Sequence, residues 1–424
     1  MKEILDKSGF EIPGGVKIGL GICVALGILM FIIGLATGDH DGLVRTWETL
    51  LINVMFWGGL AQSGVIWAVI WQLTDAKWAR PFKRMAEGFG AFLPVCFFLF
   101  ILVFFGSHVL YEWVEHPFMH HGVAVKQGWL NMHFFVTRNI FWLVLLYGIS
   151  YLFVITSLKP DFGLARQLSD GWGGKFGDFL LKGYGRQENE VVRLELISRK
   201  LAPILALAYA IGASFLAWDF IMTLDQEWFS TLFGVFVIIG SLQSALGILL
   251  AVSVTCRSKF QLEEYITINR LHDLAKMMFA FSLLWTYMGF SQYIVIWYGN
   301  IPEETPFLII RSFEQPWQTL LLVLIFWLFI SVFLLLLPKT TCRTPWFIRI
   351  MGIYVAAGQW LAMYFLIVPS LQHEGHYHFY FGFHEILITL GFAGAFFLCY
   401  LKFLSNVPLL PISDKHLCKT WHGH

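Results

Sequence analysis

Ten stretches of mostly apolar residues, each long enough to cross a bilayer, divide this 424-residue chain. A helix needs about 20 such residues to span the hydrocarbon core, and in lipid it must satisfy its own backbone hydrogen bonds. Only 13% of the residues are charged, whereas a water-soluble domain carries about 25%. The sequence therefore predicts an all-α polytopic membrane protein with ten transmembrane helices. Their approximate limits are 16–36, 50–73, 88–111, 134–156, 201–222, 229–252, 274–297, 317–337, 347–368 and 385–403.

The basic residues alternate between the two sides of these spans. The side that holds the N-terminus collects 25 of the 29 lysines and arginines. The four on the opposite side are Arg45, Lys126, Arg138 and Arg311. Because basic loops remain in the cytoplasm, both termini are predicted to be cytoplasmic. The longest connection, residues 159–200, is expected to be a cytoplasmic surface loop with one amphipathic helix and no separate soluble domain.

Charge and cysteine spacing exclude several classes of protein. The formal net charge is +1 without a block of basic residues, so nothing favours nucleic-acid binding. The six cysteines form no C-x-x-C pair, so iron-sulfur clusters, structural zinc and attached haem c lack their usual ligands. No cofactor is expected in this chain.

Spans two to five resemble spans six to nine at nearly constant offsets of 181, 184 and 185 residues. The matching patterns are Gly59-x-x-Gln62-Ser63 with Gly240-x-x-Gln243-Ser244, Ser107-His108 with Ser291-Gln292, and Ile140-Phe141-Trp142-Leu143 with Ile325-Phe326-Trp327-Leu328. An even number of crossings returns the chain to its starting side, so the two units are expected to be parallel. The predicted architecture is two parallel-repeat four-helix bundles plus two flanking helices. The predicted divisions are an N-terminal cytoplasmic segment with the first span (1–45), the first bundle (46–222), the second bundle (223–370), and the last span with a cytoplasmic tail (371–424).

Four segments carry a resemblance to a known family. They are Lys126-x-x-Trp129-Leu130-Asn131-x-x-Phe134-Phe135-x-x-Arg138, the stretch from Asp219 to Gly234, His272-Asp273-Leu-x-Lys276 with Phe290-Ser291-Gln292-Tyr293, and Trp297-Tyr298-x-Asn300-Ile301-Pro302-Glu303-Glu304-Thr305. Over about residues 45 to 405 the chain resembles the ActF-type membrane subunits of alternative complex III, within the NrfD/PsrC family of integral membrane proteins. His133 departs from the family pattern, where a small residue or proline is more usual.

The resemblance implies a subunit of a quinol-oxidising complex in the bacterial inner membrane. Such a complex carries iron-sulfur clusters and haem c in other subunits and passes electrons to a cytochrome c or a terminal oxidase. An ActC-like membrane subunit forms the main quinol site, while the ActF-type subunit holds no redox centre. That subunit anchors the assembly, and it is a candidate for proton conduction or quinol contact.

Polar residues inside the predicted spans are candidates for proton transfer or quinol contact, because each costs at least about 2.5 kcal/mol at membrane depth without a partner. His108, Arg138, Asp219 and Gln292 are expected one turn inside the non-cytoplasmic boundary. Together they form either a proton-accepting cluster that contacts quinol or, for Arg138 and Asp219, a structural ion pair.

Further candidates lie deeper in the membrane and at the cytoplasmic side. Gln62, Gln243 and Gln359 fall near mid-membrane, where they either join helices or, with Ser63, Ser244 and Tyr287, line a proton path. Asp273 and Lys276 begin span seven as a helix-end pair or as the point where protons enter.

Two other functions remain open from the sequence. Parallel helix repeats also build secondary transporters, although Pro94, Pro203 and Pro369 do not fall at matching repeat positions. A b-type cytochrome would use His108 with His133 or His384 as axial ligands. The histidines His373, His376, His378 and His384 form either a zinc site or, because their spacing lacks a helical ligand pair, a surface that meets another protein.

Overall fold

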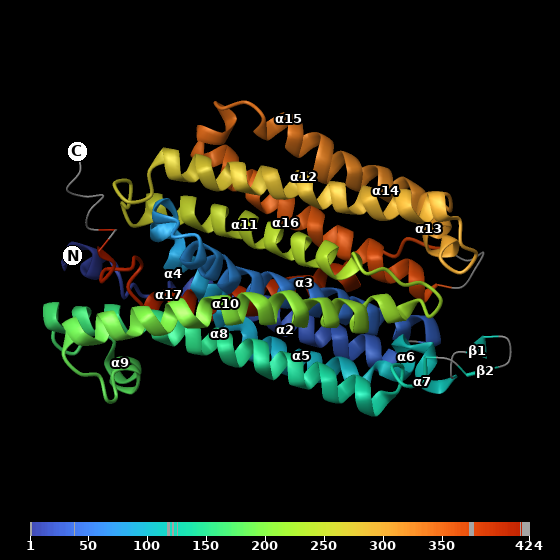
Figure 1. Cartoon of the computed structure of the whole chain (residues 1–424), viewed down its shortest axis with the longest axis horizontal. Helices are drawn as coiled ribbons and strands as arrows, with labels where there is room; N and C mark the ends of the chain where they lie inside the picture. Colours follow the sequence, from blue (N-terminus) through green and yellow to red (C-terminus); the bar gives the residue numbers. More distant parts are fainter. Residues whose placement is uncertain are drawn as a thin grey trace.

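The computed structural model describes residues 2–37, 39–116, 119–120, 123–124, 126–372, 377–415 and 417. Within these ranges, ten helical segments are long and apolar enough to cross a membrane, so the ten predicted spans are confirmed by length and composition. The long helices lie side by side along the long axis of the molecule (Figure 1). The chain is therefore a multi-pass α-helical membrane protein.

The long helices are α2 (Gly14–Thr37), α3 (His40–Leu73), α5 (Leu93–Phe105), α8 (Met132–Leu168), α10 (Gln187–Phe220), α11 (Phe233–Lys259), α12 (Ile268–Gly299), α14 (Trp317–Leu324) continued by η4 (Ile325–Ser331) and α15 (Val332–Leu336), α16 (Pro345–Ile367) and α17 (Phe383–Asn406). The shorter elements are α1 (Lys2–Lys7), η1 (Lys77–Phe82), α4 (Lys83–Glu87), η2 (Gly88–Phe92), α6 (Ser107–Leu110), α7 (Glu112–Glu115), α9 (Gly174–Leu180), η3 (Met222–Leu224), α13 (Thr305–Ser312), η5 (Thr341–Arg343) and η6 (Val368–Leu371). Two strands, β1 (Met119–His120) and β2 (Val123–Ala124), pair antiparallel.

The two ends of the bundle differ in what they carry. We call the end with α1 and residues 407–415 the terminal end, because these two segments meet there: the Leu409 amide donates a hydrogen bond to Ser8 Oγ over 3.1 Å. The opposite end, which carries α6, α7, α13 and the strand pair, is the distal end (Figure 1). Successive long helices run alternately toward one end and the other.

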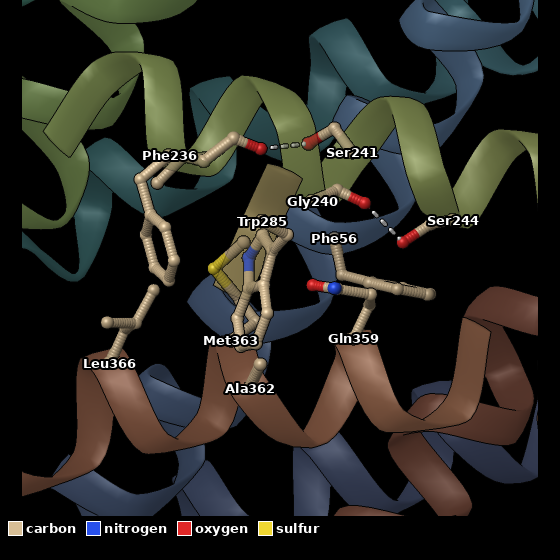
Figure 2. Close-up of a pocket in the computed structure, with 11 residues that line it drawn as sticks. Phe56, Phe236, Gly240, Ser241, Ser244, Trp285, Gln359, Ala362, Met363 and Leu366 are labelled. Atoms are coloured by element: carbon tan, nitrogen blue, oxygen red, sulfur yellow. Dashed lines mark hydrogen bonds between the residues drawn. The ribbon is translucent and has the colours of Figure 1, made fainter. Parts of the chain in front are cut away.

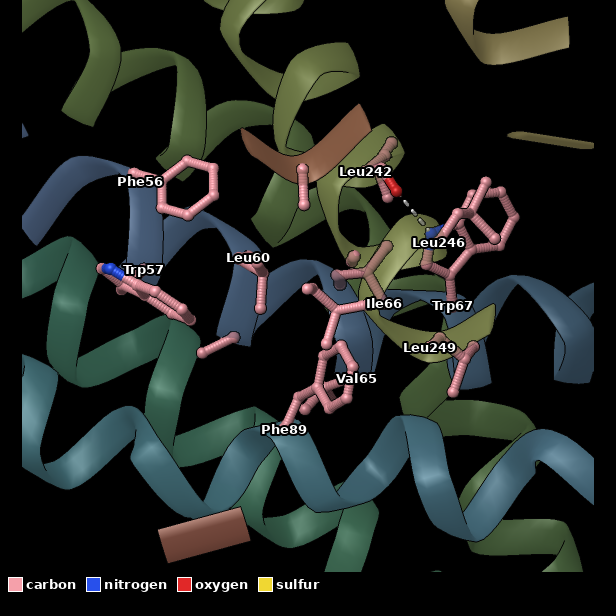
Figure 3. Packing of buried hydrophobic residues seen from close by; sticks show 14 of the residues in the cluster. Phe56, Trp57, Leu60, Val65, Ile66, Trp67, Phe89, Leu242, Leu246 and Leu249 are labelled. Carbon is pink, nitrogen blue, oxygen red and sulfur yellow. Dashed lines mark hydrogen bonds between the residues drawn. The ribbon is translucent and has the colours of Figure 1, made fainter. Parts of the chain in front are cut away.

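Helices α3 and α11 form the centre of the bundle. They pack against each other, and the Trp67 indole N–H donates to the Leu242 carbonyl across their contact over 3.0 Å (Figure 3). Leu60, Leu246 and Leu249 fill the same layer and are fully buried. Helix α3 also contacts α10 and α16, and α11 contacts the same two helices. The two central helices thus have α10 and α16 as common neighbours.

Glycines allow the closest helix contacts. A Cβ atom on Gly247 of α11 would collide with the Gly352 backbone of α16, and the reverse holds for Gly352. On the periphery, a Cβ atom on Gly27 of α2 would lie 2.7 Å from the Gly391 Cα of α17. Small residues at such contacts let helix backbones approach in lipid, where van der Waals packing drives association.

Several element boundaries differ from the sequence prediction; α3, for example, begins at His40 and not near residue 50. Span three was expected to reach residue 111, but α5 ends at Phe105, and a Cβ atom on the next residue, Gly106, would lie 2.3 Å from the Trp47 ring. The predicted loop 159–200 is largely helical, since α8 continues to Leu168 and α10 begins at Gln187. The extension of α8 packs inward, with Phe162 fully buried, so it needs no lipid to be stable.

Candidate functional site

Arg138 and Asp219 form a buried ion pair at the distal end, between α8 and α10. Arg138 Nε donates to Asp219 Oδ2 and Nη2 donates to Oδ1, both over 2.6 Å. Asp219 is completely buried and Arg138 is 7% exposed. The predicted pair is therefore present, in the bidentate geometry that gives the strongest arginine–carboxylate contacts.

The surrounding residues complete the hydrogen bonds of this pair. Asn139 Nδ2 donates to Asp219 Oδ2 over 2.9 Å, and Arg138 Nη1 donates to the Trp129 carbonyl over 2.8 Å. The guanidinium carbon also lies 4.0 Å from the Trp129 ring centroid. The Asn131 side chain caps α8 by accepting from the Phe134 amide, which fixes the helix start beside Trp129. Both charged groups are fully engaged, and this favours a structural role for the pair over proton exchange.

Most of the sequence that carries the family resemblance meets at the distal end, whereas residues 272–276 of the third segment lie near the terminal end of α12. Lys126 Nζ donates to the Gln226 carbonyl over 2.6 Å, which joins the first segment to the second. Ser230 Oγ donates to Gln292 Oε1 over 3.4 Å, which joins the second to the third. The Trp228 ring of the second segment stacks on Phe307 of α13 at 3.7 Å between centroids, and Phe307 follows the fourth segment by two residues. Residues 126–138, 219–234 and 290–305 thus meet at one end of the bundle.

The same segments leave large aromatic side chains on the outside of the molecule. Phe134 and Phe290 are exposed in these segments, and so are the four side chains considered further, Trp129, Phe229, Trp297 and Tyr298. We call these four side chains the distal aromatic set. Desolvation lowers the pKa of Lys126 beside this set, while the charges of Asp225 and Glu227 oppose that shift.

Arg311 anchors the second half of the distal end, and the sequence analysis did not identify it as a candidate. Its Nη2 donates to the Leu366 carbonyl over 2.8 Å and to Ser370 Oγ over 2.7 Å, so α13 is held against the end of α16. Burial lowers its pKa, and the nearby charge of Asp225 acts in the opposite direction. The guanidinium carbon lies 3.6 Å from the Phe307 ring centroid. A lone arginine on the weakly basic side was the only sequence signal for it.

His108 does not join the Arg138–Asp219 pair. It lies on α6, beyond the end of α5 rather than one turn inside the span, and its side chain is exposed. Gln292 is half-buried on α12, where Ser230 is its hydrogen-bond partner. The structure therefore brings together Arg138 and Asp219 from the predicted group of four, and leaves His108 outside.

The mid-membrane glutamines form two separate pairs. Gln62 Nε2 donates to Ser150 Oγ over 2.9 Å, joining α3 to α8. Gln359 Nε2 donates to Gln243 Oε1 over 2.7 Å, joining α16 to α11. Gln243 Nε2 has no hydrogen-bond partner in the described part of the chain. Both pairs act across helices, as interhelical hydrogen bonds in lipid do.

Two small cavities lie beside these glutamines. One, of about 20 Å³, is lined by Gln359, Ser241, Ser244 and Trp285 (Figure 2). The other, of about 40 Å³, lies next to Gln62 and also reaches Ser241. A buried water molecule needs at least about 10–15 Å³ and two or more polar partners, so each cavity has room for water. Neither can hold a quinone ring, because ligand pockets measure about 300 Å³ or more.

The remaining candidates lie apart from these pairs. Tyr287 faces outward and is 64% exposed, and neither it nor Ser63 lines the two cavities, whereas Ser244 lines the first. Asp273 and Lys276 are both exposed near the terminal end of α12. They do not cap the helix, since the Thr267 side chain accepts from the Arg270 amide and is the N-cap.

The histidine-rich loop is described only in part. His373 and His376 lie outside the described residues, while His378 and His384 lie within them. No group of three or more metal-ligating side chains occurs among the residues that could be searched. His133, the other candidate axial ligand, is exposed at the start of α8.

Two buried charge clusters were missed by the sequence analysis. At the terminal end, Arg84 Nε donates to Asp161 Oδ2 over 2.9 Å and its Nη1 pairs with Glu87. At the distal end, Arg45 makes a bidentate pair with Glu385. Arg84 and Glu87 are only three residues apart, but the pairs Arg84–Asp161 and Arg45–Glu385 join helices that are distant in sequence, so local spacing could not reveal these two.

The fold and the site define a polytopic α-helical membrane protein with buried charge pairs at both ends of its bundle. No family model matches the chain, and no curated protein matches it.

Proposed function

We propose that this chain is a membrane subunit of a quinol-oxidising respiratory complex of the alternative complex III type, without a redox centre of its own. The observation that carries the proposal is that most of the ActF-like sequence, residues 126–138, 219–234 and 290–305, meets at the distal end. The Arg138–Asp219 ion pair and the Ser230–Gln292 hydrogen bond connect these segments directly. Residues that are far apart in sequence but adjacent in space are expected when they form one functional surface.

The function of this surface is to hold other subunits. The distal aromatic set belongs to the same segments and is exposed. Aromatic residues are enriched where proteins dock, and also where helices meet the membrane surface. We therefore assign this surface to the partners: subunits that carry iron-sulfur clusters and haem c, with an ActC-like membrane subunit alongside and a terminal oxidase as a further neighbour. Quinol is the substrate of the complex.

We further propose that the chain consists of two parallel four-helix units related by a pseudo-twofold axis along the membrane normal. The helix contacts support this arrangement in pairs. The contact of α3 with α10 corresponds to that of α11 with α16, and the contact of α10 with α11 corresponds to that of α16 with α3. The contact between α3 and α11 would lie on the axis. The proposed flanking helices, α2 and α17, pack on each other.

The terminal end is proposed to face the cytoplasm of a bacterial inner membrane. The distribution of lysine and arginine supports this orientation, since only Arg45, Lys126, Arg138 and Arg311 belong to the connections and helix starts of the distal end. Residues that dock haem-bearing subunits would then face the periplasm.

Proton conduction is a second candidate role within the same complex. The specific observation in its favour is the cavity beside Gln359 and the unpaired amide of Gln243 next to it. The secondary-transporter alternative is less favoured, because the π-helical stretch Ile325–Ser331, the one such stretch among the described residues, has a regular α8 segment at the matching repeat position.

Native purification tests the assembly. A tagged chain, extracted in mild detergent from its own organism, is expected to migrate with subunits that give haem c absorption and iron-sulfur signals. The double variant Trp129→Ala/Phe229→Ala is expected to lose these partners. Phe98→Ala is the matched control, since Phe98 is 69% exposed on α5 in the middle of a span. A wild-type chain that migrates alone would overturn the proposal.

A further inference from the structure

Glu48 is a buried carboxyl group near the distal end of α3. Its residue is 3% exposed. No hydrogen bond joins its side chain to another residue in the described part of the chain, although the charges of Glu385 and Arg45 act on it. An ionised carboxylate in such a place needs a partner or a proton.

Among the described residues, Arg45 is the one cation that acts on Glu48, and a different carboxylate already occupies it. Arg45 Nε donates to Glu385 Oε1 over 2.5 Å and Nη2 donates to Oε2 over 2.8 Å. Glu385 Oε2 also accepts from the Gly382 amide over 2.7 Å at the start of α17. Glu385 is therefore fixed as the ionised member of the pair, and Glu48 is left beside it.

The hydrogen bonds of Tyr364 and His384, which lie near this cluster, do not require a second positive charge. The Tyr364 hydroxyl of α16 donates to the Tyr380 carbonyl over 2.7 Å. His384 Nε2 lies 3.3 Å from Thr46 Oγ1, which itself donates to the Gly42 carbonyl, so the histidine nitrogen is the donor of that contact. The contact to Thr46 needs only one protonated ring nitrogen of His384, and a neutral imidazole has one.

Charge balance therefore assigns a proton to the cluster. One guanidinium faces two carboxyl groups, and the low dielectric of a membrane interior penalises the uncompensated second negative charge. We propose that Glu48 carries this proton and that the Arg45–Glu48–Glu385 cluster is a proton-binding site open to the distal face. Arg45 provides the connection to water, because 32% of its side chain is exposed.

Polar groups continue from this site toward the middle of the membrane. Asn53, just over one turn further along α3, accepts from the Trp360 indole over 3.1 Å. The residue next to Trp360 is Gln359, which lines the 20 Å³ cavity. Further polar side chains thus lie deeper than the proton site on α3 and α16.

Infrared difference spectroscopy of the purified chain tests the proposal. The wild type at neutral pH is expected to show the C=O stretch of a protonated carboxyl group, and Glu48→Gln is expected to remove it. Gln resembles a protonated carboxyl group in shape, so this variant should fold and retain its unfolding midpoint. Transfer to D2O should shift the band, because the site exchanges with water at the distal face.

A second variant tests the charge argument. In Glu385→Gln the Arg45 guanidinium is released to Glu48, which then ionises, so the band should disappear although Glu48 is intact. The matched control is Glu314→Gln, because Glu314 is exposed and its loss should leave the band unchanged. Identical spectra for wild type and Glu48→Gln, a band that survives in Glu385→Gln, or a band that does not shift in D2O would each overturn the proposal. The measurement needs no partner subunit, so its failure would leave the proposed assembly untouched.

Discussion

Arg84 joins Asp161 at the terminal end with its Nη2 atom 2.7 Å from Oδ2, and the same aspartate accepts from the Ser413 amide over 2.8 Å. One carboxylate thus holds the third span, the long extension of α8 and the C-terminal segment together. Ser157 adds to this contact, because its carbonyl accepts from Arg84 Nη2 over 2.7 Å. The extension of α8 is therefore part of the bundle.

Removing Arg84 is expected to be strongly destabilising. Arg84→Ala leaves Asp161 and Glu87 buried without their cation, and breaking a buried pair in this way costs about 3–5 kcal/mol. Denaturant titration of the purified chain in micelles measures the loss. The control is Arg199→Ala, whose side chain is 62% exposed. Such a surface pair contributes at most about 1 kcal/mol. Equal effects of the two variants would contradict the assigned role of Arg84.

Asp219→Asn is expected to destabilise the chain for the same reason, by about 3–5 kcal/mol, because Arg138 loses its counter-charge. The double variant Arg138→Met/Asp219→Leu should recover most of that loss, since apolar residues replace a buried pair at little cost. The midpoints of unfolding for the single and double variants give the comparison. Asp273→Asn is the control, because Asp273 is exposed. A double variant less stable than Asp219→Asn would argue that the pair does more than join α8 to α10.

Gly247→Ala is expected to separate α11 from α16. The added methyl group would meet the Gly352 backbone, which cannot move aside as a flexible side chain can, so overpacking of about 1–3 kcal/mol follows. Gly148→Ala is the matched control on α8, where nothing lies within 4 Å of the added atom. Thermal unfolding of the two variants should differ in sign or in size, with Gly148→Ala neutral or stabilising.

Gln359→Leu is expected to cost about 0.6–1.7 kcal/mol, the range measured for interhelical hydrogen bonds in membranes. The double variant Gln243→Leu/Gln359→Leu should be no less stable than Gln359→Leu, because the double variant leaves no amide of this pair without its partner. Unfolding titrations measure this coupling. Proton uptake by proteoliposomes, measured on the same variants, separates the two roles: flux that falls in the double variant without loss of stability would assign the pair to a proton path.

The spans could be predicted from the sequence because the requirement for them is local. A run such as residues 317–337 is apolar over its whole length, and the structure places α14, η4 and α15 over nearly the same range. Boundaries were predicted less well where a distant residue decides them. Trp47, which lies next to Gly106, is 59 positions away in sequence, and no local sequence pattern predicts that contact.

The candidate site could be predicted from the sequence only where the depth of a residue in the membrane is enough to identify its partner. Arg138 and Asp219 were paired correctly because both lie at matching depths in neighbouring spans. Depth does not reveal which side of a helix a residue occupies, so it could not separate outward-facing Tyr287 from inward-facing Ser244. Glu48 was overlooked because it precedes the apolar run of its span, where a charge ordinarily lies in water.

The contact between α2 and α17 has a consequence for how the chain is made. Gly27 and Gly391 face each other in this contact, so the first span finds its partner in the last one. During synthesis α2 enters the membrane hundreds of residues before α17 exists, and until then lipid must occupy the face that α17 will cover. This contact therefore closes only when α17 is inserted, and a chain released before that point leaves α2 with α3 as its neighbour.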